Sequence, residues 1–259
     1  MTNHPFLKPL ALLAAILLVS TMAMAAHKRV LYIGDSITDG GWGRSGGLMK
    51  PTSERNLTDL NHLYGHSFMM LCAAHYMSLC PDSDYVFINR GISGNTLADV
   101  AARWQPDALD LQPDVVTLLV GTNDADRYLA QRAKNPDIVF DYPAWQQQYE
   151  QLLSQLQAQN PHVKIILGTP FVDQGGNIGN RPDFAERRDI IARLARIIED
   201  IARRHGAALL PYHEMFASLV QSQPRPHYWI WDGIHPTAAG HQRMADLWIA
   251  TADRLHILN

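Results

Sequence analysis

Hydrophobic and polar positions along the chain follow two alternating patterns. Short apolar runs rich in β-branched residues predict strands over 30–33, 84–89, 114–120, 163–168 and 207–210. Apolar residues at helical spacing predict helices over 61–80, 97–104, 142–156, 190–205, with Gly206 as C-cap, 212–220 and from 237 to about 255. Strands that alternate with helices form a parallel sheet covered on both faces, so the pattern predicts an α/β fold.

The first 25 residues have the pattern of an export signal. Lys8 supplies a positive charge, an apolar stretch covers 10–19, and Ala23-Met24-Ala25 fits a small-x-small cleavage site. We therefore expect a signal peptide over 1–25, one domain over 26–259, and a mature protein that is periplasmic or secreted. This apolar stretch is short for a membrane span. No second apolar stretch is long enough to span, so no integral membrane association is expected after cleavage. An uncleaved N-terminal anchor is the alternative.

Composition and charge narrow the possible partners. The chain has 259 residues, of which 47% are hydrophobic and 18% charged, as in a globular domain with a substantial core. A formal net charge of -3 gives no basic surface of the kind that binds nucleic acid, so no nucleic-acid partner is expected. The composition does not indicate an oligomeric state.

The two cysteines, Cys72 and Cys80, lie on one predicted helix. Eight residues of helix separate their Cα atoms by roughly 12 Å, which is too far for a disulfide. Two buried free thiols are therefore expected, although a helix that ended before Cys80 would permit a bond.

The first strand ends abruptly at Gly34-Asp35-Ser36. A serine at the start of the following helix has its hydroxyl outside the sheet and the positive end of the helix dipole beneath it. That setting suits the nucleophile of an acyl-transfer reaction. Serine is also a common helix N-cap, so Ser36 alone does not decide between the two interpretations.

Three other stretches carry the remaining groups that such a site needs. His235 could accept the proton of Ser36, and Asp232 could orient the imidazole. The N–H groups of Ser36 and Gly94, with the side-chain amide of Asn123, could bind an oxyanion. Each residue also has an ordinary interpretation, as a tight turn, a cap or a helix entry. Four such coincidences would have to combine to imitate one complete site.

Four motifs in the sequence resemble, in order, the four sequence blocks of the SGNH (GDSL-type) hydrolases. They are Gly34-Asp35-Ser36-Ile37-Thr38, Gly91-Ile92-Ser93-Gly94-Asn95, Gly121-Thr122-Asn123-Asp124 and Asp232-Gly233-Ile234-His235-Pro236. The resemblance implies a flavodoxin-like three-layer α/β/α sandwich with a five-stranded parallel sheet of order 2-1-3-4-5.

The same resemblance implies a serine esterase that uses no metal and no cofactor. In it Ser36 is the nucleophile, His235 the base and Asp232 its orienting carboxylate. Ser36, Gly94 and Asn123 form the oxyanion hole. The departure from the family pattern is a long glycine-rich segment, 39–61, that follows the nucleophile.

Two further motifs are weaker candidates for chemistry. Ser45 lies in a formal G-x-S-x-G, but it has neither a strand before it nor a helix after it, so we interpret it as a loop residue. His62 and His66 are spaced as zinc ligands often are, but no glutamate follows His62 and no third ligand is apparent. No metal site is therefore expected.

The substrate is indicated only weakly. The resemblance allows lipids, thioesters and acetylated sugars. Trp42 and Arg44 follow the nucleophile, and Trp231 lies beside His235, where aromatic and polar groups could contact a sugar, although such tryptophans also pack in cores. We favour a carbohydrate acetylesterase as the function, with a small-molecule or glycan ester as the substrate. A lysophospholipase or thioesterase, an acyltransferase and a catalytically silent glycan-binding module are the alternatives.

Overall fold

The computed structural model describes residues 28–46, 49–223, 225 and 227–258. The predicted signal peptide over 1–25 lies outside the described residues. No helix in the described part of the chain combines the length and the apolar character needed to cross a membrane.

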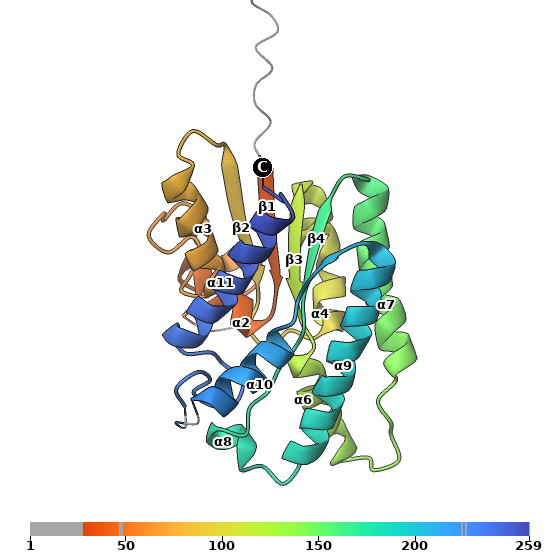
Figure 1. Cartoon of the computed structure of the whole chain (residues 1–259). Helices are drawn as coiled ribbons and strands as arrows, with labels where there is room; N and C mark the ends of the chain where they lie inside the picture. Colours follow the sequence, from red (N-terminus) through yellow and green to blue (C-terminus); the bar gives the residue numbers. More distant parts are fainter. Residues whose placement is uncertain (1–27, 47–48, 224, 226, 259) are drawn as a thin grey trace, which may run out of the picture.

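A parallel sheet of five strands forms the centre of the molecule, in the order β2-β1-β3-β4-β5 (Figure 1). Its strands are β1 (Lys28–Gly34), β2 (Tyr85–Gly91), β3 (Val115–Leu119), β4 (Lys164–Gly168) and β5 (Ala208–Leu210). Every residue of β3 is buried, because helices cover both faces of the sheet. The order confirms the predicted flavodoxin-like topology.

Helices form the two outer layers, each with its own apolar core. One face is covered by α4 (Leu97–Ala102), α5 (Trp104–Asp107), α6 (Thr122–Arg132), α7 (Tyr142–Gln159) and α9 (Phe184–His205). The other is covered by α3 (Phe68–Leu79), α10 (Tyr212–Ser222) and α11 (Ala238–Arg254). Successive strand residues alternate between the two cores: Leu31 and Ile33 lie in the first, and Val30 and Tyr32 in the second. The three-layer α/β/α sandwich is thereby confirmed.

Short helices lie in the connections. They are α2 (Ser36–Asp39), α8 (Gly176–Gly179) and the 3₁₀ turns η1 (Trp42–Arg44), η2 (Thr52–Glu54) and η3 (Leu109–Leu111). The segment 39–61 therefore contains two 3₁₀ turns.

One predicted helix begins later than expected, and one helix was not predicted. The helix expected over 61–80 begins only at Phe68, because Gly65 has φ of +74° and a Cβ there would lie 2.6 Å from the carbonyl oxygen of Gly40. The helix α6 was not predicted, because Ala125 and Leu129 are its only buried apolar residues and give a weak periodicity. The C-cap predicted at Gly206 is confirmed by its left-handed φ of +63°.

Both cysteines are free thiols in the structure. Cys72 is buried within α3, as expected, but Cys80 is only partly buried because it follows the end of that helix.

Candidate active site

Ser36 lies just beyond the carboxyl end of strand β1, as the first residue of α2. Asp35 caps that helix, since its Oδ1 accepts the N–H of Ile37 at 3.0 Å. Gly34 is the last residue of β1, and a Cβ on it would lie 2.2 Å from the carbonyl oxygen of Leu119 in β3. The close packing of β1 on β3 therefore requires glycine, and it fixes where the chain turns to present Ser36.

His235 and Asp232 complete a relay with Ser36. Oγ of Ser36 lies 2.8 Å from Nε2 of His235, and Nδ1 of His235 lies 2.7 Å from Oδ2 of Asp232. A carboxylate at Asp232 accepts the Nδ1–H, so Nε2 is left as the acceptor for the hydroxyl of Ser36. In this tautomer His235 is ready to act as a base toward Ser36.

The contacts of Asp232 shift the pKa values of both Asp232 and His235. Partial burial alone would raise the pKa of Asp232, but hydrogen bonds from the side chain and N–H of His235 and from the N–H of Ile234 lower it to about 2. The hydrogen bond to Asp232 raises the pKa of His235 above its usual 6.5 despite burial, and the charges of Asp232 and Asp35 add to the rise. The protonated form of His235 is therefore stabilised.

The turn that carries Asp232 is held from outside the relay by the segment around α8. The N–H of Asp173 donates to the carbonyl of Gly233 at 2.9 Å, and the N–H of Ile178 donates to the carbonyl of Asp232 at 3.2 Å. Gly233 has φ of +100°, and a Cβ there would lie 2.7 Å from the carbonyl oxygen of Gly175. This packing leaves the carboxylate of Asp232 little freedom to leave His235.

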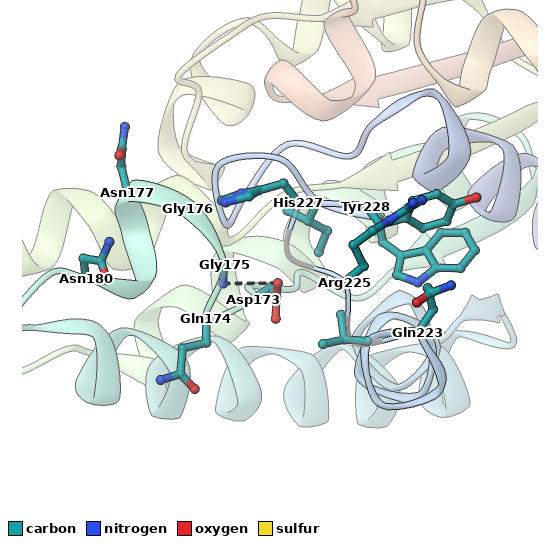
Figure 2. Close-up of a pocket in the computed structure, with 13 residues that line it drawn as sticks. Asp173, Gln174, Gly175, Gly176, Asn177, Asn180, Gln223, Arg225, His227 and Tyr228 are labelled. Carbon is teal, nitrogen blue, oxygen red and sulfur yellow. Dashed lines mark hydrogen bonds between the residues drawn. The ribbon is translucent and has the colours of Figure 1, made fainter.

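The segment around α8 also forms one wall of a cleft of about 490 Å³ (Figure 2). In it Oδ2 of Asp173 accepts the N–H of Gly175 at 3.2 Å. The opposite wall includes Arg225, His227 and Tyr228. None of the three residues of the relay lines this cleft, so it is separate from the nucleophile.

Gly94 and Asn123 lie beside Ser36. The N–H of Asn95 donates to the carbonyl of Ile92 at 3.2 Å, closing a turn in which Gly94 has φ of +79°, a conformation that favours glycine. One N–H of the Asn123 amide donates to the carbonyl of Asn95 at 3.1 Å, which leaves the second N–H for another acceptor. A different, open cleft of about 690 Å³ is lined by Ser36, Gly94, Asn123 and His235, and it is the one called the cleft below.

The three predicted substrate contacts have different outcomes. Trp231 lines the cleft and is 56% exposed, and its ring stacks on that of His235 at an interplanar angle of 26°, with 6.4 Å between the ring centroids. Trp42 is fully buried and donates its indole N–H to the carbonyl of Gly91 at 2.7 Å, so the prediction that it contacts substrate is wrong. Arg44 does not line the cleft: it is exposed and pairs with Asp59.

The weaker motifs do not form sites of their own. Ser45 is a buried loop residue, as predicted. His62 binds Asp59 through Nδ1 at 3.1 Å, whereas His66 lines the cleft. They are not on one helix, since α3 begins at Phe68. Within the described ranges no group of three or more His, Cys, Asp or Glu side chains is arranged to hold a metal ion.

The sequence did not reveal two polar features near the site. His241 on α11 lines the cleft, its Nδ1 accepts the N–H of Phe68 at 3.1 Å, and burial lowers its pKa to about 4. Asp39 and Arg55 form a buried ion pair next to the turn of Gly94. Nothing in the spacing of these residues signals the contact, because a glycine-rich loop joins them.

Comparison with known proteins places these features in a family. A model of the GDSL-like lipase/acylhydrolase family matches residues 32–243. An acetylxylan esterase from Geobacillus stearothermophilus is 31% identical over 227 residues, covering 86% of this chain and 93% of that protein.

Solved structures show the same relationship. LAE5, described as an α/β hydrolase enzyme from the metagenome of Lake Arreo in Spain, is 32% identical with a TM-score of 0.68 and covers 89% of this chain and 97% of its own. A catalytic mutant of the acetylxylan esterase Axe2 from G. stearothermophilus is 25% identical with a TM-score of 0.70, covering 89% of this chain and 96% of that one. In the Axe2 mutants described as catalytic, an aspartate, a histidine or a serine is replaced by alanine.

Proposed function

The chain belongs to the GDSL-like lipase/acylhydrolase family, and we propose that it is a serine esterase that removes acetyl groups from carbohydrates. As a member of this family it is a carboxylic ester hydrolase. The observation that carries the proposal is the relay itself: Ser36 Oγ, His235 and Asp232 are joined by hydrogen bonds of 2.8 and 2.7 Å in an open cleft.

The geometry supports the following acylation step. Nε2 of His235 removes the proton of Ser36 as Oγ attacks the ester carbonyl, and Asp232 stabilises the resulting imidazolium. The negative charge that develops on the carbonyl oxygen is met by the N–H groups of Ser36 and Gly94 and by the free amide N–H of Asn123. His235 then gives its proton to the departing sugar oxygen, leaving an acetyl group on Ser36.

Deacylation reverses these roles with water. His235 removes a proton from a water molecule as the water oxygen attacks the acetyl carbonyl, and it returns the proton to Oγ of Ser36 as acetate leaves. The same oxyanion donors serve both steps. A sugar hydroxyl in place of the water would give acyl transfer, which product analysis with added polyols detects.

Two observations favour an acetylated sugar as substrate. The cleft is open and presents an exposed indole face at Trp231 next to His235, where a pyranose ring could stack. The relative with 31% identity over most of both chains is an acetylxylan esterase. The proposed triad has separate support, since Axe2 carries its catalytic aspartate three residues before its catalytic histidine, the spacing of Asp232 and His235 here.

We also propose that residues 1–25 direct export to the periplasm or the medium. A polymeric substrate such as acetylated xylan is too large to enter a cell, so an enzyme that acts on it needs to reach it outside.

The test is acetate release from acetylated xylan, pectin and sialic acid, with short-chain and long-chain nitrophenyl esters and a lysophospholipid run in parallel. Acetate from one carbohydrate, with no activity on long acyl chains, supports the proposal. Preference for long acyl chains would replace it with a lipase function. Absence of hydrolysis with retained polysaccharide binding would indicate a glycan-binding module.

A further inference from the structure

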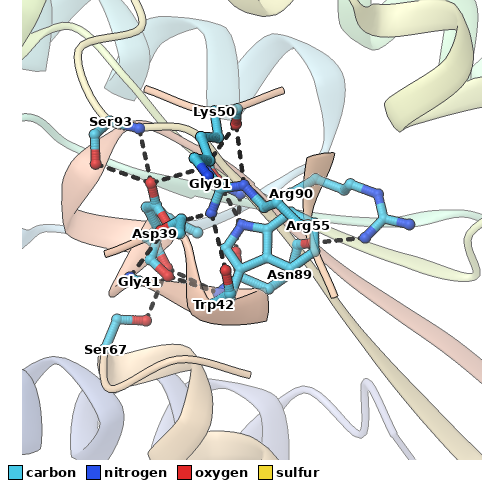
Figure 3. Close-up of polar contacts among 12 residues, drawn as sticks. Asp39, Gly41, Trp42, Lys50, Arg55, Ser67, Asn89, Arg90, Gly91 and Ser93 are labelled. Atoms are coloured by element: carbon cyan, nitrogen blue, oxygen red, sulfur yellow. Dashed lines mark hydrogen bonds and ion pairs between the residues drawn. The ribbon is translucent and has the colours of Figure 1, made fainter. Parts of the chain in front are cut away.

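A buried ion pair between Asp39 and Arg55 lies beside the proposed oxyanion hole (Figure 3). Neither side chain is exposed. Nη1 of Arg55 lies 2.6 Å from Oδ1 of Asp39, and Nη2 lies 3.1 Å from Oδ2, a bidentate arrangement. The remaining N–H groups of Arg55 donate to the carbonyls of Lys50 and Trp42 at 2.9 to 3.2 Å. All five guanidinium donors therefore have acceptors.

Asp39 also connects the nucleophile to the turn of Gly94. It is the last residue of α2, the helix that begins with Ser36. Its Oδ2 accepts both the backbone N–H of Ser93 at 2.9 Å and the hydroxyl of Ser93 at 2.8 Å. Because Ser93 directly precedes Gly94, one carboxylate holds the helix of the nucleophile and the residue next to an oxyanion donor.

The connection continues to the third oxyanion donor. Asn95, which follows Gly94, closes the turn with its N–H and accepts the amide of Asn123 at 3.1 Å with its carbonyl oxygen. Hydrogen bonds and adjacent backbone therefore join Asp39, the turn of Gly94 and Asn123 in one continuous network.

Trp42 packs against the ion pair and fixes its position. The guanidinium carbon of Arg55 lies 4.5 Å from the centroid of the Trp42 ring, and that of Arg90 lies 5.2 Å from it. The indole N–H donates to the carbonyl of Gly91. Gly91 itself packs closely on α2, since a Cβ on it would lie 2.3 Å from the backbone nitrogen of Asp39. The ion pair is thus packed tightly against the carboxyl end of β2.

We propose that the Asp39–Arg55 pair is the positioning device of the oxyanion hole, because it holds Ser93 and so keeps the N–H of Gly94 fixed relative to Ser36. The inference rests on the oxyanion role proposed above for Gly94. Donors that are fixed before the reaction stabilise developing charge without reorganising. The bidentate contact with Arg55 directs both oxygens of the Asp39 carboxylate. This assigns a role to the segment 39–61 that follows the nucleophile.

Two variants test the proposal through catalysis and not through folding alone. Asp39→Asn keeps the shape of the side chain but replaces one acceptor oxygen with a donor that faces other donors. Ser93→Ala removes one of the two hydrogen bonds to Asp39 without changing any charge. Steady-state hydrolysis of nitrophenyl acetate gives kcat and KM. Inhibition by phenylboronic acid, which forms a tetrahedral adduct on an active serine, gives the affinity for a transition-state mimic.

We expect Asp39→Asn to lower kcat at least tenfold and Ser93→Ala at least threefold, with KM within twofold of wild type. The inhibition constant of phenylboronic acid should rise by the same factor as kcat falls, because only the tetrahedral state uses the oxyanion hole. The control is Ile198→Val, a core substitution on the other face of the sheet, which should lower the melting temperature and leave both quantities unchanged.

The proposal is overturned if folded Asp39→Asn and Ser93→Ala proteins retain wild-type kcat and boronic-acid affinity, and the esterase function then still stands. If Asp39→Asn does not fold, Ser93→Ala decides the question by the same two measurements. A wild-type protein that neither hydrolyses esters nor is labelled at Ser36 by a fluorophosphonate would instead remove the proposed function, and the positioning role with it.

Discussion

Ser36 Oγ and His235 Nε2 lie 2.8 Å apart, although 199 positions separate the two residues in the sequence. The helix that follows His235 fixes this distance. Trp248 of α11 packs on Tyr32 of β1 with 5.3 Å between ring centroids, and it donates its indole N–H to Thr117 of β3 at 2.9 Å. The core of the sheet therefore sets both ends of the hydrogen bond, and the pair is arranged for proton transfer.

Replacement of the nucleophile should abolish turnover without unfolding the protein. Ser36→Ala is expected to lower kcat by roughly 10⁴- to 10⁶-fold, because the members of a triad act as a unit. The melting temperature should change little, since Oγ makes a single hydrogen bond, to His235. Acetate release and fluorophosphonate labelling measure the loss. Ser78→Ala, an exposed serine on α3, is the matched control, and significant activity in Ser36→Ala would contradict the assignment.

The pH dependence should report the protonation of His235. The base must be neutral, and Asp232 raises the pKa of His235 above 6.5, so kcat/KM should rise with pH through a midpoint above 6.5. Asp232→Asn removes the main cause of the rise. Its midpoint should therefore move to lower pH, while the maximal rate falls by roughly 10³- to 10⁴-fold. Rates measured from pH 4.5 to 9 test both effects. An unmoved midpoint in Asp232→Asn would mean that Asp232 is not the cause of the raised pKa.

The amide of Asn123 should matter mainly in the transition state. Asn123→Ala is expected to lower kcat by roughly 10²- to 10³-fold if the amide donates to the oxyanion. KM should stay close to wild type, because the ground-state carbonyl carries little charge. Steady-state kinetics on nitrophenyl acetate measures the split, with Asn135→Ala, an exposed asparagine that does not line the cleft, as control. Undiminished kcat in Asn123→Ala would remove this role.

The strands and the residues at their carboxyl ends could be predicted because their signals are local, whereas the strand order and the roles of the site residues were implied by the resemblance to the SGNH hydrolases. Apolar runs mark the strands, and in a parallel sheet their carboxyl ends meet at one edge, so Ser36, Gly94 and Asn123 were expected together. The relay residues His235 and Asp232 are three positions apart, and their contact is also local.

The features that the sequence did not reveal depend on tertiary contacts. Trp42 was expected at the surface near substrate, but the buried Arg55 stacks on its ring and Gly91 accepts its N–H. The late start of α3 depends on Gly65 packing against the carbonyl of Gly40. Contacts between loops leave no periodic pattern in the sequence, so the burial of Trp42 and the start of α3 could be learned only from the structure.

The buried carboxyl group of Asp35 should make stability depend on pH. Burial raises its pKa from 3.8 to about 7 in the folded protein, against the hydrogen bond from Ile37 that lowers it. A raised carboxyl pKa favours the folded state at low pH, and that contribution is lost as pH rises from about 4 through about 7. Asp35→Asn keeps the helix cap and removes this loss, since asparagine is also a good N-cap.

The melting temperature of Asp35→Asn relative to wild type should therefore increase between pH 4.5 and 8. Thermal unfolding followed by circular dichroism measures the difference at each pH. Asp82→Asn, which changes an exposed carboxylate, is the control and should show no such trend. A constant difference across this range would mean that Asp35 does not titrate in the way its burial implies.

Trp231 offers a test of the proposed sugar specificity. Its ring is 56% exposed beside His235, so stacking of a pyranose on the indole should contribute to binding and not to bond cleavage. Trp231→Ala should raise KM for acetylated xylo-oligosaccharides by roughly three- to tenfold, the equivalent of about 1 kcal/mol for an aromatic contact. Trp231→Phe keeps an aromatic face and should recover most of the loss. Methyl acetate has no ring to cover the indole, so its kcat/KM should change less than twofold in either variant. Equal losses on both substrates would mean that Trp231 acts through His235 and does not hold the sugar.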